Sequence, residues 1–160
     1  MKTSFAALLT ACVLLAGSAI AATPTTSPLV GRWSLDIASL PMPPEARPKG
    51  VTLAFSQPDA NTWTTQIQIV DPQGGTMDSG ATLSLDGTPG KVTGSYWADV
   101  ATAKMPAPDV VVIQLAYQGT PSSTRIYSVS QDGATLTETK AFFSKEGQPM
   151  LQTTTFTRLP

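Results

Sequence analysis

The sequence predicts an all-β domain whose sheet closes into a single up-and-down antiparallel β-barrel of about eight to ten strands. Short runs of alternating or β-branched residues recur along the chain. Gly, Pro and Asp separate these runs at intervals of about 8 to 12 residues, which is typical of a sandwich or barrel. No stretch has sustained helical periodicity. Turn signals such as Asp86-Gly87 and Asp132-Gly133 join neighbouring runs as hairpins, and this order favours a closed meander.

The composition leaves room for one domain and argues against several classes of function. The chain has 160 residues, a formal net charge of −1 and no cluster of Lys or Arg, so we expect no nucleic-acid partner. It contains no His and a single cysteine, Cys12, and these residue types are often used for metal binding and nucleophilic catalysis. We therefore expect no metal, no cofactor and no catalytic residue, which argues against an enzyme.

Residues 1–21 have the pattern of a signal peptide. Lys2 supplies a positive charge, residues 5–15 are almost entirely apolar, and Ala19-Ile20-Ala21 provides the small residues of a cleavage site. The apolar run is shorter than the ~20 residues that span a bilayer, so we expect no stable membrane insertion. Cleavage after Ala21 predicts an exported protein, periplasmic or secreted.

The mature chain divides into a flexible N-terminal arm, residues 22–29, and a barrel domain, residues 30–160. The arm is rich in Pro, Thr and Ser. The candidate strands are residues 30–37, 51–57, 62–70, 76–85, 91–97, 109–117, 122–130, 134–143 and 149–158. Alternation predicts inward rows that include Val51, Leu53 and Phe55; Trp63, Thr65, Ile67 and Ile69; Met77, Ala81, Leu83 and Leu85; and Val111, Ile113, Leu115 and Tyr117. Outward polar rows include Thr135, Thr137, Thr139, Thr153, Thr155 and Thr157.

Two proline-rich segments interrupt this rhythm, residues 40–48 and 98–108. One interpretation is that both are rigid connections. The other is that they form the rim of a barrel mouth, with Met42 and Met105 as adaptable apolar contacts. The sequence leaves both interpretations open.

The motif Gly31-Arg32-Trp33, at the start of the first predicted strand, resembles the Gly-x-Trp opening of lipocalins and related calycins. The run of hairpins from residue 30 to residue 158 is similar to the barrel of that superfamily and to small exported bacterial lipocalin-like proteins of unassigned function. The resemblance implies that Trp33 plugs the closed end of the barrel and that Arg158 packs across its indole ring. The chain lacks the disulfide and the second motif of classical secreted lipocalins, so the resemblance concerns the architecture.

The motif Arg125-Ile126-Tyr127 resembles the Arg-x-Tyr pair with which intracellular fatty-acid-binding barrels hold a carboxylate. On a strand Arg125 and Tyr127 point to the same face, and a guanidinium and a phenol can together bind an anion. In that family the pair lies on the final strand, whereas two more strands are predicted to follow here. An outward-facing surface pair is the alternative.

The leading hypothesis is an exported binding protein that holds a small hydrophobic or amphipathic molecule inside the barrel. Its candidate ligand-binding residues are Arg125, Tyr127, Trp97, Trp63, Tyr117, Met42 and Met105. The first alternative is a protein-interaction or inhibitor module with a filled barrel. The second is a metal-independent isomerase or cyclase. The sequence leaves the ligand and the oligomeric state open.

Overall fold

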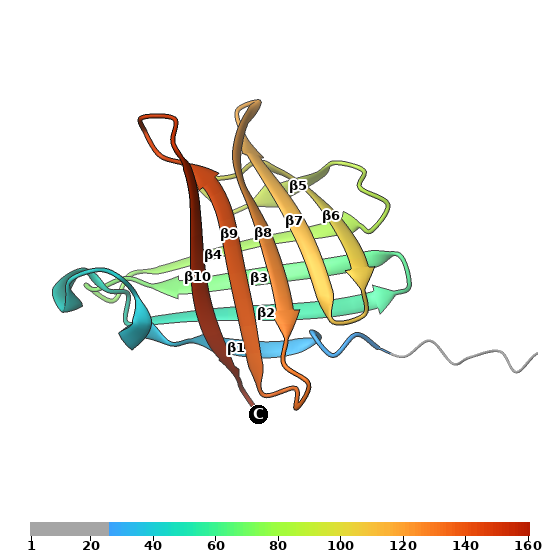
Figure 1. Ribbon diagram of the computed structural model, residues 1–160, viewed down its shortest axis with the longest axis horizontal. Helices are drawn as coiled ribbons and strands as arrows, with labels where there is room; N and C mark the ends of the chain where they lie inside the picture. Colours follow the sequence, from blue (N-terminus) through green and yellow to red (C-terminus); the bar gives the residue numbers. More distant parts are fainter. Residues whose placement is uncertain (1–25) are drawn as a thin grey trace, which may run out of the picture.

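The architecture is seen in a computed structural model that describes residues 26–160 (Figure 1). These residues form ten strands and two short 3-10 helices. The strands are β1 (Gly31–Leu35), β2 (Gly50–Asp59), β3 (Thr62–Val70), β4 (Thr76–Ser84), β5 (Gly90–Thr93), β6 (Val100–Ala107), β7 (Val110–Tyr117), β8 (Thr120–Val129), β9 (Thr135–Phe143) and β10 (Pro149–Arg158). The 3-10 helices are η1 (Ile37–Ser39) and η2 (Pro44–Ala46).

The strands form one closed antiparallel barrel. Each strand pairs with the next strand along the chain, and β1 pairs with β10 to complete the ring. In Figure 1, β2, β3 and β4 cross behind β7 to β10 at a steep angle. The predicted all-β, up-and-down barrel is therefore confirmed.

The alternation of apolar residues places the core inside this ring. Leu53, Phe55, Trp63, Leu83 and Val111 are each at most 3% exposed. On β9 and β10 the Thr residues of the two polar rows face each other, as in the pairs Thr137 with Thr155 and Thr139 with Thr153. Leu136 and Phe156 occupy alternate positions on the same strands and are buried, so the Thr rows lie on the outer face.

One predicted loop is a strand. The expected strand 91–97 is reduced to β5, and most of the expected connection 98–108 forms β6. Ala101 and Ala103 alternate into the core from β6, and their small side chains give no strong apolar signal in the sequence. Pro106 is accommodated because the pairing with β7 shifts register between Lys104 and Ala107, and a bulge tolerates a residue that cannot donate.

Tyr117 does not continue the inward row of β7. Tyr117 is the last residue of β7 and is paired with Thr120 beside the β7–β8 turn. Its side chain is 38% exposed. The prediction that Tyr117 faces the interior is therefore wrong.

One end of the barrel is closed by Trp33. Its ring is fully buried, its Nε1 donates to the Leu29 carbonyl at 2.9 Å, and the guanidinium carbon of Arg158 lies 4.0 Å from the ring centroid. Arg158 also donates to the backbone carbonyls of Pro28, Val30 and Gly133. These bonds join the segment before β1 to the β8–β9 turn.

The segment just before β1 belongs to this closed end. Leu29 is fully buried, and the Ser27 hydroxyl donates to the Pro108 carbonyl at 2.6 Å. Residues 27–29 are thus packed against the barrel, which differs from the flexible arm expected over 22–29. The expected signal peptide, residues 1–21, lies outside the described residues. Within residues 26–160 no helix is long and apolar enough to cross a membrane.

Candidate ligand-binding site

The opposite end of the barrel is an open mouth. It contains a cavity of about 530 Å³. The residues that line it are Met42, Val51, Leu53, Ile67, Ile69, Tyr96, Trp97, Ser122, Ser123, Arg125, Glu138, Lys140, Phe142 and Phe156. Most of this lining is apolar, and we call this space the mouth cavity. Its size lies within the ~300 to 1,000 Å³ typical of small-molecule sites.

Four polar side chains gather on the inner face of β8 and β9. Arg125 is paired across the strands with Lys140, and Tyr127 with Glu138, so alternation points all four side chains to the interior. A guanidinium nitrogen of Arg125 lies 3.4 Å from a carboxylate oxygen of Glu138. The side chains of Arg125 and Glu138 are only 18% and 9% exposed. Charge is thus concentrated at one place in an otherwise apolar interior.

The surroundings of these groups change their proton affinities. Burial lowers the pKa of Lys140, and the neighbouring Arg125 lowers it further against the opposing effect of Glu138. Burial alone lowers the pKa of Arg125, but Tyr127 and Glu138 outweigh it and raise that pKa above its ordinary value. Burial and the Glu138 carboxylate raise the pKa of the Tyr127 phenol. At neutral pH, Arg125 is therefore a cation and Tyr127 is a neutral phenol.

A smaller cavity of about 40 Å³ lies deeper in the barrel. It shares Ile67, Trp97 and Arg125 with the mouth cavity, so these three side chains separate the two spaces. The Arg125 guanidinium carbon lies 6.0 Å from the centroid of the Trp97 ring. Arg125 Nε and the Thr65 hydroxyl also border the deep cavity, and neither has a hydrogen-bond partner among residues 26–160. This volume holds a few water-sized groups but no extended ligand.

The rest of the lower barrel is filled with aromatic side chains. The Phe55 ring centroid lies 5.3 Å from that of Trp63 and 5.1 Å from that of Tyr127. Trp63 is fully buried and lines neither cavity. A ligand that enters through the mouth therefore meets packed core below Arg125 and Trp97.

Comparison with known proteins gives a match at the level of structure alone. No family model matches the sequence, and no curated protein matches it. Crystal structures of two single-site mutants of the fluorescent protein UnaG are similar to this chain, with 15% identity and TM-scores of 0.54 and 0.55. The first alignment covers 84% of this chain and 98% of that chain, and the second covers 85% and 99%. The fold is a lipocalin-like, calycin-type barrel. At this identity the likeness concerns the fold alone.

Within this calycin-type barrel, the structure brings together some of the predicted site residues and separates others. Arg125, Trp97 and Met42 line the mouth cavity, and Tyr127 lines the deep cavity. Met105 lies near the end of β6, two residues before Ala107 and close to the turn that contacts Ser27 at the closed end. Met42 and Met105 therefore do not form a common rim. The interpretation that both proline-rich segments surround one mouth is wrong for residues 98–108.

Sequence reasoning missed Glu138 and Lys140. A signal for them was present, because the outward Thr135, Thr137 and Thr139 require the even-numbered residues of the same strand to point inward. Charged residues are seldom assigned to the inside of a barrel, since burial without a partner is costly. Arg125 supplies that partner for Glu138. Within residues 26–160 no three Asp, Glu, Cys or His side chains gather as metal ligands would.

Proposed function

We propose that this protein is an exported binding protein that holds a small amphipathic molecule in the mouth cavity. An anionic group of the ligand binds at Arg125 and Lys140, and its apolar part packs against the aromatic and aliphatic walls. The observation that carries this proposal is the charge of the cavity. Two cations and one carboxylate line it, so the net charge favours an anion.

Lys140 is the cation of the mouth cavity that is available to bind an anion. Glu138 already neutralises Arg125, and this is the one ion pair found within residues 26–160. The Lys140 ammonium instead lies 4.3 Å from the centroid of the Phe142 ring. A cation–π contact of this kind compensates part of the lost hydration and leaves the ammonium able to bind a carboxylate, sulfonate or phosphate.

The size of the mouth cavity favours ligand binding over the interaction-module hypothesis, which calls for a filled barrel. The polar cluster also bears on the second alternative, an isomerase or cyclase, because Glu138 and Lys140 can exchange protons with a bound molecule. The two functions differ in the fate of the ligand. A binding protein returns the molecule unchanged, whereas an isomerase returns a mixture that chromatography resolves.

The experiment that tests the proposal compares a charged ligand with a neutral ligand of equal length. Arg125→Gln is expected to weaken decanoate binding by at least about 1.5 kcal/mol, or about tenfold in Kd, and to change decanol binding much less. Glu138→Gln is expected to tighten decanoate binding because it removes the carboxylate that competes for Arg125. Isothermal titration calorimetry gives both constants.

Two further variants distinguish a loss of ligand recognition from a loss of folding. The double variant Arg125→Gln/Glu138→Gln removes both charges and so leaves no buried ion without its partner. Ile126→Thr changes the neighbouring residue on the outer face of β8 and is expected to leave both affinities unchanged. Equal losses for decanoate and decanol in Arg125→Gln and in the double variant would show that Arg125 does not recognise charge.

Export is part of the same proposal and rests on residues 1–21. The pattern of Lys2, the apolar run and Ala19-Ile20-Ala21 supports cleavage after Ala21. We expect the secreted chain to begin at Ala22, and N-terminal sequencing of protein from its own host measures this directly. A chain that begins at a lipid-modified Cys12 would contradict it and would place the protein on a membrane.

A further inference from the structure

The barrel wall is open between β8 and β9 at the mouth. The pairing of these strands stops at Thr124 and Ala141, although β8 begins at Thr120 and β9 continues to Phe143. Beyond that point, the end of β8 is paired with β7, and the end of β9 is paired with β10. The β7–β8 and β9–β10 hairpins therefore diverge, and Figure 1 shows their turns apart at the top of the view.

A groove of about 560 Å³ lies on the outer side of this opening. The residues that line it are Gln114, Leu115, Pro121, Ser122, Ser123, Thr124, Ala141, Phe142, Phe143, Pro149, Met150 and Leu151. We call it the β8–β9 groove. It shares Ser122, Ser123 and Phe142 with the mouth cavity. Two small hydroxyl side chains and one ring thus separate the inside of the mouth from the outer groove.

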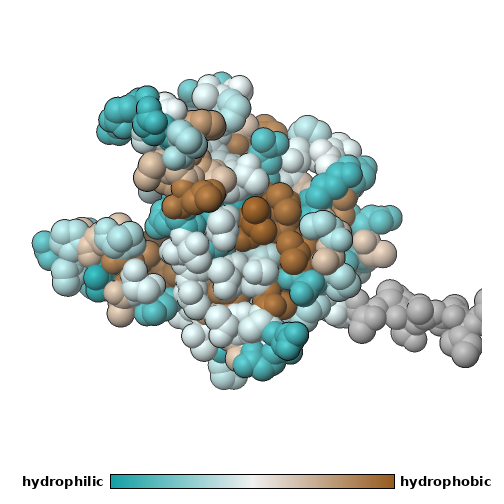
Figure 2. Space-filling model, in the orientation of Figure 1, coloured by the Kyte–Doolittle hydropathy of each residue, from teal (hydrophilic) through white to brown (hydrophobic). Residues whose placement is uncertain are grey.

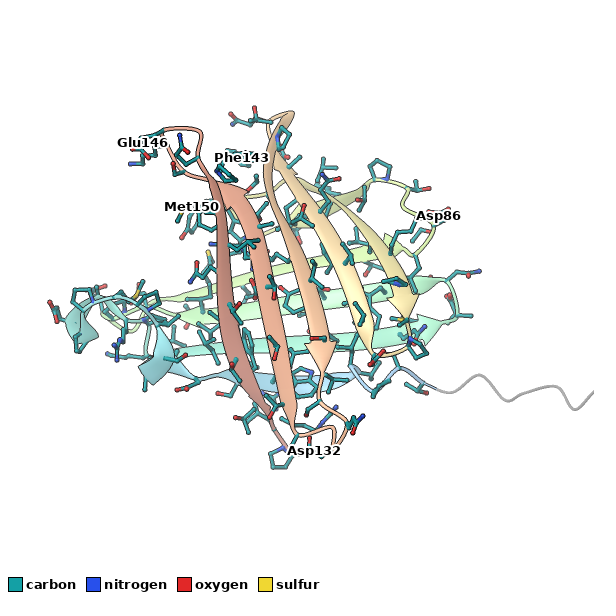
Figure 3. The ribbon with its side chains drawn as sticks, viewed as in Figure 1. Asp86, Asp132, Phe143, Glu146 and Met150 are labelled. Atoms are coloured by element: carbon teal, nitrogen blue, oxygen red, sulfur yellow. The ribbon has the colours of Figure 1, made fainter. Side chains whose placement is uncertain are left out.

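The groove carries exposed apolar side chains beside the polar Thr rows of β9 and β10. Phe143 and Leu151 are 71% and 74% exposed, and the other outward positions of β9 and β10 include the two Thr rows. In Figure 3, Phe143 and Met150 lie at the mouth end of this hairpin, far from Asp132 at the closed end. Figure 2 shows apolar surface near the upper part of β10. Exposed apolar residues gathered beside an open site mark a binding surface.

The deep cavity provides no alternative space for a long ligand. It measures about 40 Å³, and packed aromatic rings lie below it. A chain whose polar group is held at Lys140 therefore gains little length by entering the deep cavity. Phe142 is in contact with the Lys140 ammonium and borders the β8–β9 groove, so one side chain connects the head-group position to the opening.

We propose that the β8–β9 groove is the second half of the ligand site and holds the alkyl chain of a long amphiphile whose anionic group lies at Arg125 and Lys140. This inference rests on the proposed function and specifies its ligand class. The anionic group stays inside the mouth. The chain passes between Ser122, Ser123 and Phe142 and covers Phe143 and Leu151 on the outside.

A series of alkyl carboxylates tests the groove separately from the head-group site. Hexanoate, decanoate and tetradecanoate are titrated below their micelle concentrations, and binding is followed by the change in tryptophan fluorescence, to which Trp97 in the mouth contributes. Each methylene that becomes buried is expected to tighten binding about fourfold. The affinity should therefore rise steadily through tetradecanoate.

The matched variants are Phe143→Thr/Leu151→Thr and Ile126→Thr. The double variant converts the groove to the residue type of the neighbouring outer positions, and Ile126 is an exposed apolar residue of β8 outside the groove. The double variant is expected to bind tetradecanoate about tenfold more weakly and hexanoate unchanged. Ile126→Thr should change neither affinity.

Two results would overturn the proposal in distinguishable ways. If hexanoate binds and the double variant binds tetradecanoate as tightly as the unchanged protein, the head-group site stands and the groove holds no chain. If no member of the series binds the unchanged protein, the proposed function fails, and the groove proposal fails with it.

Discussion

Lys140 of β9 lies opposite Arg125 of β8, and both side chains line the mouth cavity. Burial and the neighbouring guanidinium lower its pKa below the ordinary lysine value of about 10.4. Its positive charge is therefore lost at a lower pH than that of an exposed lysine. An anionic ligand that depends on this charge should bind in a pH-dependent way.

The sign of the pH effect follows from the direction of this shift. Decanoate is ionised throughout the neutral and alkaline range, so the change in charge belongs to the protein. The Kd for decanoate is expected to be constant near neutrality and to rise as the pH passes upward through the lowered pKa of Lys140. Calorimetry across the alkaline range measures it.

Two lysine variants identify the group responsible for this pH profile. Lys140→Met should bind decanoate more weakly at neutral pH. Its Kd for decanoate should not rise with pH until the pH reaches the range in which an ordinary lysine loses its proton. Lys91→Met, which changes an exposed lysine on β5, should keep the profile of the unchanged protein. A profile that survives in Lys140→Met would show that another group controls it.

At the scale of elements, β1 illustrates why the Gly-x-Trp opening needs its glycine. Gly31 has a φ of 138°, and a Cβ at this position would lie 2.5 Å from a guanidinium nitrogen of Arg158. Glycine therefore allows Arg158 to cross the strand and cover Trp33. The motif, the last strand and the closed end form one structural unit.

Truncation of Trp33 should destabilise the barrel strongly while sparing the mouth. Trp33→Ala is expected to lower the free energy of unfolding by about 3 to 5 kcal/mol, because it removes a fully buried ring and leaves a cavity. Denaturant melts measure this loss. The Kd for decanoate, measured where the variant is folded, should stay unchanged because Trp33 lies at the opposite end. A neutral effect on stability would contradict the assignment of Trp33 as the plug of the closed end.

The strands also show which parts of the fold can be predicted from sequence patterns and which cannot. Alternating large apolar residues were sufficient to place β2, β3 and β4, because Leu53, Trp63 and Leu83 mark the buried face unambiguously. Ala101 and Ala103 of β6 have side chains too small to mark a face, so the strand looked like a proline-rich loop. Tyr117 was expected in the core because alternation continues to the last residue of β7, but alternation does not show where a strand runs out into an exposed turn.

Only part of the candidate site could be predicted, because alternation along a strand relates residues to one another but does not identify the buried face. Strand geometry obliges Arg125 and Tyr127 to share a face, but it does not say which face is buried. Glu138 decides this in the structure, since it gives the guanidinium a partner inside the barrel. The sequence predicts that β8 and β9 are neighbours, but it does not predict the register that places Glu138 beside Arg125.

At the scale of the whole molecule, the two ends of the barrel have different physical characters. The closed end is held by Trp33, Arg158 and packed aromatic rings, which leave no room for a ligand. The mouth combines an open cavity, a charged cluster and a gap in the wall between β8 and β9. The molecule therefore places the candidate ligand site at the mouth and its most tightly packed aromatic residues at the other end.

Native mass spectrometry of protein purified from its own host tests the central claim most directly. We predict one chain carrying one small amphipathic acid, and we predict that a smaller fraction of the Lys140→Met variant, prepared in the same way, carries the bound mass. Decanoate added to the ligand-free protein serves as the control for survival of a complex in the gas phase. Bare protein from the host, in a measurement that preserves the decanoate complex, would contradict the claim that the mouth cavity carries a ligand.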